Sequence, residues 1–395
     1  MGALKVTDRI YSVGVLDRDL RVFDIIMRTD YGTTYNSYLL MGDTKIALIE
    51  SVKDGFFEEH IENILEIVDP AKIDFLILNH TEPDHSGSVA RFLELAPNTT
   101  VLASKAALMF LAEIVNRPVY GRAVTESDEI DLGGLTLRFL TTPLLHWPDT
   151  QYTYVPEAKA LFTCDSFGCH YVSDPPYADT ADHAYMASYQ DYFDHIIAPF
   201  KQPNMTNALA KIAPLDIELI APGHGPMLRE NIDQLVGLHK RWCAPEARPK
   251  RIALAYVSAY GYTRSLAEQI AGGIRERGVE LDVFDLTACD LDAASAAIAS
   301  ADGFLLGSPT LLGDALPPIW SMLIGINPII HKGKLAGAFG CYGWSGEAVP
   351  NLMARIAQLK LATPLEGLRV RFKPTEADLE NAAQFGRAFA DEVLK

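Results

Sequence analysis

The pattern of apolar segments changes near Trp242–Lys250, and no other feature constrains the fold as strongly. Before this point, short apolar segments alternate with turn residues. After it, strand-like and helix-like segments alternate regularly to the C-terminus. The intervening Cys-Ala-Pro-Glu-Ala-Arg-Pro-Lys holds two prolines and few apolar residues, which is typical of a linker. Because 395 residues also exceed the size of one ordinary core, we expect two domains, 1–249 and 250–395.

The N-terminal half is expected to be a layered α/β or α+β sandwich. Apolar residues recur at helical spacing from Phe57 to Val68, and Asp69-Pro70 ends the predicted helix. Mixed short strands and helices favour layers packed on one another. The apolar runs predicted to form strands are Ile46–Ile49, Phe75–Leu78, Leu135–Thr141, Ala160–Thr163 and Ile217–Ile220.

The C-terminal half is expected to be an open, doubly wound parallel sheet, because strands and helices alternate throughout it. Helices are predicted over Arg264–Arg277 and Leu379–Leu394. The predicted strands are Ile252–Val257, Glu280–Leu286, Gly303–Gly307 and Ala336–Gly340.

Charge and composition narrow the range of partners and compartments. The net charge of −17 disfavours nucleic acid or an anionic membrane surface as the main partner. No apolar run reaches the roughly 18–20 residues that span a bilayer, and the N-terminus shows no signal-peptide pattern. The five cysteines form no C-x-x-C pair, which predicts a reducing cytoplasm and neither disulfides nor a cysteine-bound metal.

The strongest local signal is the segment His80-Thr81-Glu82-Pro83-Asp84-His85, which carries four potential metal ligands directly after a predicted strand. A loop leaving a strand can bring several side chains to one point, whereas a helix would spread them around its circumference. Further ligand types follow predicted strand ends, with His146 after the run Leu135–Leu145, Asp165 after Ala160–Cys164 and His224 after Ile217–Ala221. We expect these side chains to converge on one rim.

These ligand types divide into two matching sets. His80, Glu82 and His146 supply two imidazoles and one carboxylate. Asp84, His85 and His224 supply the same combination, which leaves Asp165 as a bridge. Sets of two histidines and one carboxylate favour non-haem iron. Two metal ions roughly 3.5–4 Å apart can hold a small diatomic ligand between them.

A second cluster lies at the start of the C-terminal half, between a predicted strand and a predicted helix. Hydroxyl and backbone N–H groups at a helix N-terminus can bind a phosphate without a lysine. Neither G-K-[ST] nor G-x-G-x-x-G is present, so a single phosphate, as in FMN, is favoured over the pyrophosphate of FAD or NAD. The segment consists of Ser258, Ala259, Tyr260, Gly261, Tyr262 and Thr263.

Two later loops follow predicted strands of the same sheet. Ligands of open α/β sheets bind beyond the carboxyl ends of the strands, where these loops and the phosphate loop meet. Trp344 can stack on a flat ring. The residues concerned are Pro309, Thr310 and Leu311 in the first loop, and Tyr342, Gly343, Trp344, Ser345 and Gly346 in the second.

These motifs resemble a known family along nearly the whole chain. The first half resembles the metallo-β-lactamase fold, an αββα sandwich whose hydrolases carry H-x-H-x-D-H and bind zinc. The glutamate at the second histidine position, Glu82, resembles flavodiiron proteins, also called A-type flavoproteins or rubredoxin:oxygen oxidoreductases. The order phosphate loop, Ser-Pro-Thr loop and Trp-Ser-Gly loop resembles flavodoxin. His146-Trp147-Pro148-Asp149 and Gly32-Thr33-Thr34-Tyr35-Asn36 also resemble family signatures.

The resemblance implies a reaction and partners. Two non-haem irons per chain and one FMN hold four electrons, which suffice to reduce O2 to two waters, and the reduction of NO to N2O needs only two. An external donor is implied, either a rubredoxin or reduced cofactor F420. A head-to-tail homodimer, or a dimer of dimers, is also implied. His170, Tyr192 and His195 lie near the metal segments in sequence and are candidates for delivering protons.

Two other classes of function remain open at this stage. A zinc-dependent metallo-β-lactamase-type hydrolase with an accessory flavin domain would use the same ligands, although Glu82 favours iron. A non-enzymatic electron carrier would use the flavodoxin-like half alone, although the complete ligand set disfavours it.

Overall fold

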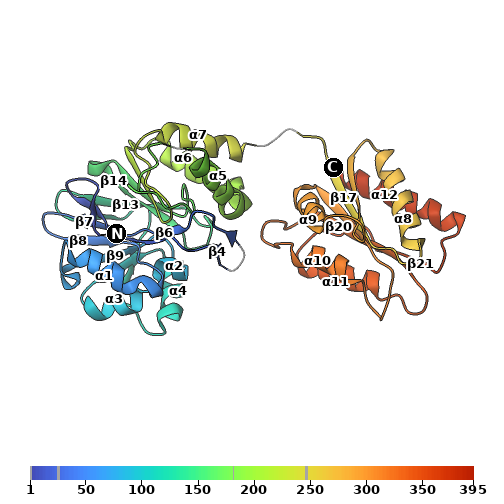
Figure 1. Cartoon of the computed structure of the whole chain (residues 1–395), viewed down its shortest axis with the longest axis horizontal. Helices are drawn as coiled ribbons and strands as arrows, with labels where there is room; N and C mark the ends of the chain where they lie inside the picture. The colour runs from blue at the N-terminus through green and yellow to red at the C-terminus, as the bar shows by residue number, and fades with distance from the viewer. Residues whose placement is uncertain (1, 25–26, 181, 245–247) are drawn as a thin grey trace. The chain divides into compact units, whose positions relative to one another are not determined.

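The computed structural model describes residues 2–24, 27–180, 182–244 and 248–395. It divides into two compact units, Met1–Pro245 and Glu246–Lys395 (Figure 1). The predicted boundary, between residues 249 and 250, lies a few residues further along the chain. The predicted linker begins at Cys243, which the structure shows to be the last residue of helix α7 (Ile232–Cys243). Residues 245–247 of the linker lie outside the described residues.

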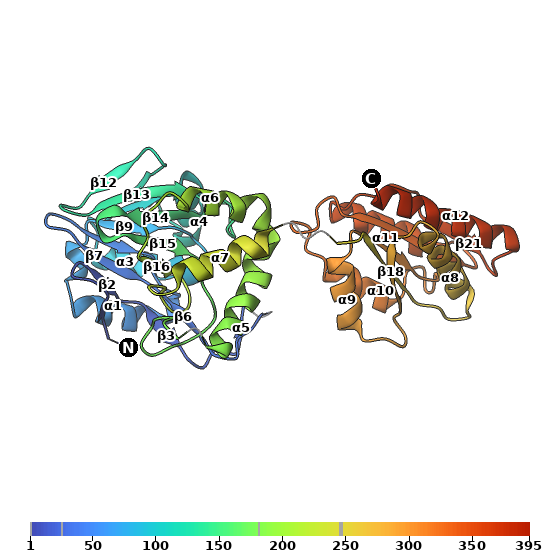
Figure 2. The same cartoon turned by 90° about the horizontal axis from the view of Figure 1, so that it is seen from above.

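Two β-sheets form the centre of the N-terminal unit. The first has the strand order β1-β2-β7-β8-β9-β10-β11, and the second has the order β12-β13-β14-β15-β16. Figure 2 shows β12 to β16 side by side in this order. The first sheet consists of β1 (Leu4–Lys5), β2 (Ile10–Ser12), β7 (Tyr38–Met41), β8 (Ile46–Ile49), β9 (Phe75–Leu78), β10 (Thr100–Ala103) and β11 (Gly121–Ala123). The second consists of β12 (Glu129–Asp131), β13 (Thr136–Thr141), β14 (Gln151–Val155), β15 (Ala160–Cys164) and β16 (Leu219–Pro222). Two short pairs, β3 (Val15–Asp17) with β6 (Thr33–Tyr35) and β4 (Val22–Phe23) with β5 (Met27–Arg28), lie outside these sheets.

Each sheet is covered by helices on its outer face (Figure 1). Alternate residues of a strand point to opposite faces, so in β9 Ile77 packs between the sheets while Leu76 and Leu78 pack against the first helical layer. This layer contains α1 (Phe57–Leu65), α3 (Val89–Leu95) and α4 (Lys105–Val115). The opposite layer contains α5 (His183–Tyr192), α6 (Thr206–Ile212) and α7. The order of layers is helix, sheet, sheet, helix, which confirms the predicted αββα sandwich.

The C-terminal unit is a parallel sheet with the order β18-β17-β19-β20-β21, the doubly wound order of flavodoxin-like folds. Its strands are β17 (Arg251–Tyr256), β18 (Glu280–Asp285), β19 (Gly303–Gly307), β20 (Leu335–Tyr342) and β21 (Leu368–Arg371). Helices α8 (Tyr262–Arg275) and α12 (Glu376–Val393) cover one face. Helices α9 (Leu291–Ser300), α10 (Pro317–Ile324) and α11 (Ala348–Gln358) cover the other, which confirms the predicted architecture.

Several predicted elements are displaced. The first predicted helix ends at Leu65 rather than Val68. The last strand of the second sheet, β16, runs two residues later than predicted, and α12 starts earlier because Thr375 and Asp378 form a capping box. All five cysteines are free thiols. Among the described residues, no helix combines the length and apolar character needed to cross a membrane.

Candidate functional site

The segment 80–85 leaves the end of β9 and brings four ligand types to the edge of the sandwich. His80 and Glu82 lie in the connection after β9, but Asp84 and His85 belong to a single helical turn, α2 (Pro83–Ser86). The prediction of a simple loop is therefore wrong for these two residues. Pro83 explains the turn, because its fixed φ and missing N–H suit the first position of a helix. One turn is too short to spread its side chains around a circumference.

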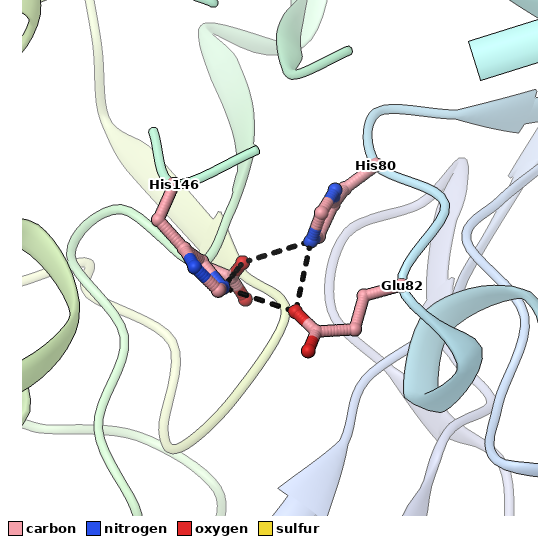
Figure 3. Close-up of side chains that lie close together, drawn as sticks. His80, Glu82 and His146 are labelled. Atoms are coloured by element: carbon pink, nitrogen blue, oxygen red, sulfur yellow. Dashed lines mark hydrogen bonds and ion pairs between the residues drawn. The ribbon is translucent and has the colours of Figure 1, made fainter. Parts of the chain in front are cut away.

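The first group of ligand types contains His80, Glu82, His146 and Asp165. Figure 3 shows His80, Glu82 and His146 pointing toward one another. Glu82 Oε2 lies 3.2 Å from His80 Nε2 and 3.0 Å from His146 Nε2. Asp165 Oδ2 lies 3.5 Å from His80 Nε2 and 3.4 Å from His146 Nε2. Two imidazoles and two carboxylates thus present their donor atoms to one point.

The second group contains Asp84, His85 and His224, and it shares Asp165 with the first. Asp84 Oδ2 lies 3.0 Å from His224 Nε2 and 3.7 Å from His85 Nε2. Asp165 Oδ1 lies 3.1 Å from His85 Nε2 and 3.6 Å from His224 Nε2. Gly223 permits this approach, since a Cβ there would lie 2.5 Å from His85 Cε1. The two oxygens of Asp165 therefore face different groups.

His146 reaches the first group by a route that the sequence did not indicate. Strand β13 ends at Thr141, as its predicted range Leu135–Thr141 has it, so His146 does not lie directly past a strand end as expected. Pro143 cannot donate to a strand ladder, so the chain turns away, and the Leu144 N–H donates to the Trp147 carbonyl at 2.7 Å. His146 thus lies within a long loop, whereas Asp165 directly follows β15 as predicted.

Hydrogen bonds from outside the two groups fix the imidazole rings. His80 Nδ1 lies 3.3 Å from Asp149 Oδ1, and Asp149 Oδ2 accepts from the N–H and the hydroxyl of Thr81 at 2.9 and 2.7 Å. His224 Nδ1 donates to the Thr34 carbonyl at 2.6 Å. Such partners select the ring nitrogen that is free to bind a metal. Asp149 and Thr34 lie in the two signature segments noted in the sequence, but neither was predicted to support a ligand.

The carboxyl groups of the cluster are held in their ionised form. Burial favours the neutral form of Glu82, but the imidazoles of His146 and His80 outweigh burial and lower its pKa to about 2. Burial likewise opposes ionisation of Asp165, yet His85, His80 and His146 lower its pKa well below the usual range. Burial favours neutral His80 as well, but the nearby carboxylates of Asp149, Glu82 and Asp165 raise its pKa to about 10.

These buried charges fit a pair of metal ions. Asp84 Oδ1 and Asp165 Oδ2 are buried and have no hydrogen-bond partner among the described residues. A buried anion without donors is costly unless a cation binds it. Imidazole nitrogens and carboxylate oxygens in sets of two histidines and one carboxylate suit iron. The donor set therefore accommodates the two non-haem irons expected from the sequence.

Two further acidic residues lie beside the cluster, and nothing in the sequence marked them. Glu50 Oε1 accepts from the Asn79 N–H at 2.8 Å, Glu50 Oε2 lies 3.8 Å from His85 Nδ1, and burial raises the Glu50 pKa to about 7. Partial burial and the carboxylates of Glu82 and Asp84 raise the pKa of Asp24. Both residues place a further carboxyl group beside the ligand groups, in surroundings that favour its neutral form.

The three candidates for proton delivery occupy different environments. The His170 ring lies 5.5 Å from the His224 ring, and its Nδ1 lies 2.9 Å from the Thr33 hydroxyl. The Tyr192 ring lies 4.9 Å from that of His170 and 6.2 Å from that of His224. His195 is exposed and its Nδ1 donates to the Asp191 carbonyl at 2.8 Å, so it does not line the metal groups.

The C-terminal unit contains a cavity of about 650 Å³ at the carboxyl ends of its strands. Every predicted cofactor residue lines it except Gly261 and Gly346, whose φ angles of 84° and 83° form the turns beside it. Leu312, Gly313, Cys341 and Phe372 also line the cavity and were not predicted. Phe372 follows β21, a segment in which no motif pointed to a ligand.

The walls of this cavity suit a planar, phosphorylated ligand. Gly261 is the N-cap residue of α8, and the first N–H groups of a helix have no acceptor within the helix and can bind a phosphate. Aromatic rings line the cavity but remain open to solvent, with Tyr260 81%, Trp344 94% and Phe372 54% exposed. A flavin ring would cover such surfaces, so the cavity fits the predicted FMN.

Comparison with known protein families matches both units. Residues 33–225 match the ODP family beta lactamase model, and residues 254–386 match the flavodoxin model. The flavo-diiron protein FprA2 of Clostridium acetobutylicum is 42% identical over 403 residues, with both chains covered completely. These matches span the metal-ligand groups and the cofactor cavity.

Two solved structures are similar to this chain over nearly its whole length. The flavodiiron protein of Giardia intestinalis is similar with a TM-score of 0.70 and 29% identity, and the match covers 100% of this chain and 97% of that one. The rubredoxin oxygen:oxidoreductase of Desulfovibrio gigas is similar with a TM-score of 0.72 and 26% identity, covering 99% and 98%.

Proposed function

Because the chain belongs to the flavo-diiron protein family, a family of oxidoreductases with a non-haem diiron centre and FMN, we propose that it reduces O2 to water, NO to N2O, or both. The observation that carries this proposal is the position of Asp165. Its two carboxylate oxygens face two separate groups, each with two histidines and a further carboxylate. One bridging carboxylate between two such groups is suited to a pair of irons that act together on a diatomic molecule.

The residues divide between the two ions in this proposal. His80, Glu82 and His146 would hold one ion, Asp84, His85 and His224 would hold the other, and Asp165 would be shared between them. When bound, the ferrous pair and reduced FMN supply the four electrons that O2 needs, or the two that convert two NO molecules to N2O. The outer partners Asp149 and Thr34 keep the imidazole rings of His80 and His224 oriented.

The exposure of the ligands supports a direction of approach for the gas. In the first group the side chains of His146 and Glu82 are 21% and 16% exposed. In the second group the side chains of His224 and Asp84 are 2% and 8% exposed. Solvent therefore reaches the cluster beside His146, and we propose that O2 or NO enters there while the second group remains closed.

Electrons must come from outside the chain, and we propose a rubredoxin as donor, with reduced F420 as the alternative. The name of the Desulfovibrio gigas protein associates that relative with a rubredoxin. We also propose a head-to-tail homodimer, or a dimer of dimers. Exposed apolar side chains at the cofactor cavity, among them Leu312 and Trp344, support a covered surface there. A monomer in sedimentation that retained full turnover would contradict the dimer.

The test is gas consumption in a sealed electrode cell, with iron- and FMN-replete protein, reduced rubredoxin, and O2 or NO in parallel runs. Fast loss of O2 without release of peroxide indicates an oxygen reductase, and fast loss of NO indicates a nitric oxide reductase. His80→Ala should abolish both activities and leave FMN bound. If the loaded protein consumes neither gas with rubredoxin or with a chemical reductant, but hydrolyses a thioester or lactam with zinc, the hydrolase interpretation replaces this one.

A further inference from the structure

Three cations lie close together on the edge of the parallel sheet. Arg369 and Arg371 belong to β21, the last strand of the sheet, and Lys373 follows two residues later. Val370 is buried between the two arginines, so the arginine side chains point to the opposite face of the strand. All three cations are exposed. We call Arg369, Arg371 and Lys373 the basic strip.

The basic strip is not neutralised by the chain itself. None of its members forms a salt bridge with any residue that the structure describes, whereas other exposed arginines of the same unit do, such as Arg264 with Asp285 and Arg277 with Asp391. The chain as a whole carries a net charge of −17. Charged side chains on an edge strand prevent unwanted pairing, but this role demands neither a positive sign nor a particular location.

The basic strip borders the cofactor cavity. Phe372, between Arg371 and Lys373, lines the cavity and is 54% exposed. Arg371 is paired in register with Tyr342, a second lining residue, and its guanidinium lies 5.7 Å from the centre of the Phe372 ring. A protein seated on the strip would therefore lie against the rim of the cavity.

We propose that the basic strip is the docking surface for a small acidic electron-carrier protein that reduces FMN. The inference rests on the proposed function, since it concerns the electron supply to the same flavin. An acidic carrier is repelled by a chain with a net charge of −17, so a productive encounter needs local attraction beside the flavin. Two carrier molecules each give up one electron and leave oxidised, and two protons from water complete the reduction of FMN to its hydroquinone.

The test uses two charge-reversed forms of the full-length, iron- and FMN-loaded protein. Arg369→Glu/Arg371→Glu alters the basic strip. Arg275→Glu/Lys332→Glu is the matched control, because it changes the net charge equally at exposed positions of the same unit that do not line the cavity. Neither control residue forms a salt bridge with a described residue. FMN content and thermal stability are measured for both, so that a folding defect is recognised.

The first readout is the binding of oxidised rubredoxin with a negative net charge, measured by calorimetry without turnover. The strip variant should raise its Kd about tenfold or more at low salt, and the control should change it less than about twofold. The second readout is the rate of FMN reduction by reduced rubredoxin in stopped flow, which should fall by the same factor. Reduction by the viologen radical cation should not fall in the strip variant.

Several results would overturn the docking surface. Equal effects of the two variants would do so. A Kd of the native protein that does not rise between about 20 and 200 mM salt would also do so, because contacts between exposed charges are screened over this range. The salt series uses the native protein and stands even if a variant misfolds. Gas consumption with a chemical reductant is measured separately. If the protein consumes no gas with a chemical reductant, the proposed function is contradicted. The binding comparison still tests the docking surface in that case.

Discussion

The metal-ligand cluster and the cofactor cavity differ in how their side chains are held. In the N-terminal unit, His80, Asp165 and His224 are buried and come from separate strand ends. The two histidine rings are fixed by hydrogen bonds to Asp149 and to the Thr34 carbonyl. In the C-terminal unit, the walls of the cavity include Tyr260 and Trp344, which are largely exposed. One site is built around largely buried charge, and the other is walled by exposed aromatic side chains.

Because of this difference, the two cofactors should depend on the protein in different ways. Ionised carboxylates buried without sufficient donors need metal ions for charge balance, so loss of a ligand affects the whole cluster. An exposed aromatic wall contributes contact area and little to the folding of its own unit. Changes in one site should therefore leave the other cofactor bound. Three substitutions test this, and a fourth compares the acid stability of the two units; all four follow in order of decreasing effect.

The largest effect is expected from Asp165→Ala, which removes the carboxylate that faces both ligand groups. Iron binding and gas consumption should fall more than about 100-fold, because the remaining groups lose their shared ligand. FMN absorbance should remain unchanged. Iron is measured by mass spectrometry and gas at the electrode. Asp216→Ala, at an exposed ion pair with Lys159, is the control and should resemble the native protein. An Asp165→Ala protein that kept both irons would refute the bridge.

A smaller effect, about 10- to 100-fold in the affinity of one ion, is expected from Asp149→Asn. The substitution weakens the partner of His80 Nδ1, while the Thr34 carbonyl still holds His224. When iron is limiting, the total iron content should fall toward half of the native value, and the iron should be lost only from the group that contains His80. Mössbauer spectroscopy distinguishes the two sites. Equal loss from both groups would show that Asp149 stabilises the fold as a whole and does not orient one ligand.

The sequence predicted the residues of the metal-ligand cluster, but it did not predict the residues that hold them in place. His80, Asp165 and His224 follow strands closely, and strand ends of one layered domain meet at a common edge. Asp149 approaches His80 and Glu50 approaches His85 only after distant segments pack, so no local pattern marks their roles. His146 was predicted, but its long loop was not, because it was expected directly past a strand end and β13 already ends at Thr141.

Most residues that line the cofactor cavity were predicted because they follow strand ends, but Phe372 was not predicted. The loops after β17, β19 and β20 are recognisable because each follows an apolar strand. Phe372 comes from the segment after β21, which carries alternating arginines and no glycine or hydroxyl motif. Its place in the cavity depends on contact with Gly343, where a Cβ would lie 2.9 Å from the Phe372 ring. Such a contact is set by tertiary packing and is invisible to periodicity.

Acid should destabilise the N-terminal unit through its buried histidines. Burial lowers the pKa of His60 and of His239 to about 3, whereas the C-terminal unit contains one histidine, His331, with a pKa of about 4. An unfolded histidine titrates near 6.5, so below that pH the unfolded chain gains protons that the folded chain does not. Stability is then lost as the pH falls from about 6.5 toward 3, by about 2 kcal/mol per residue at pH 5.

His60→Leu tests this expectation, because neither ring nitrogen of His60 has a hydrogen-bond partner among the described residues. At pH 7 the variant should be as stable as the native protein or slightly more stable. At pH 5 it should retain about 2 kcal/mol that the native unit loses, measured by scanning calorimetry of the full chain. The exposed His183→Leu is the control. Equal acid sensitivity of all three proteins would mean that His60 is protonated in the folded state.

The smallest effect is expected from Trp344→Ala in the open cavity. The indole is 94% exposed, so its removal should leave the unfolding temperature of the flavin-free protein unchanged. Stacking on a flat ring contributes about 1 kcal/mol, so the Kd for FMN should rise roughly fivefold to tenfold, measured by quenching of flavin fluorescence. Tyr120→Ala, which removes another largely exposed aromatic side chain (75%) in the N-terminal unit, should leave FMN affinity unchanged. Iron content should be native in both variants. Loss of iron in Trp344→Ala would mean that the two sites are coupled, because all the metal-ligating side chains belong to the other unit.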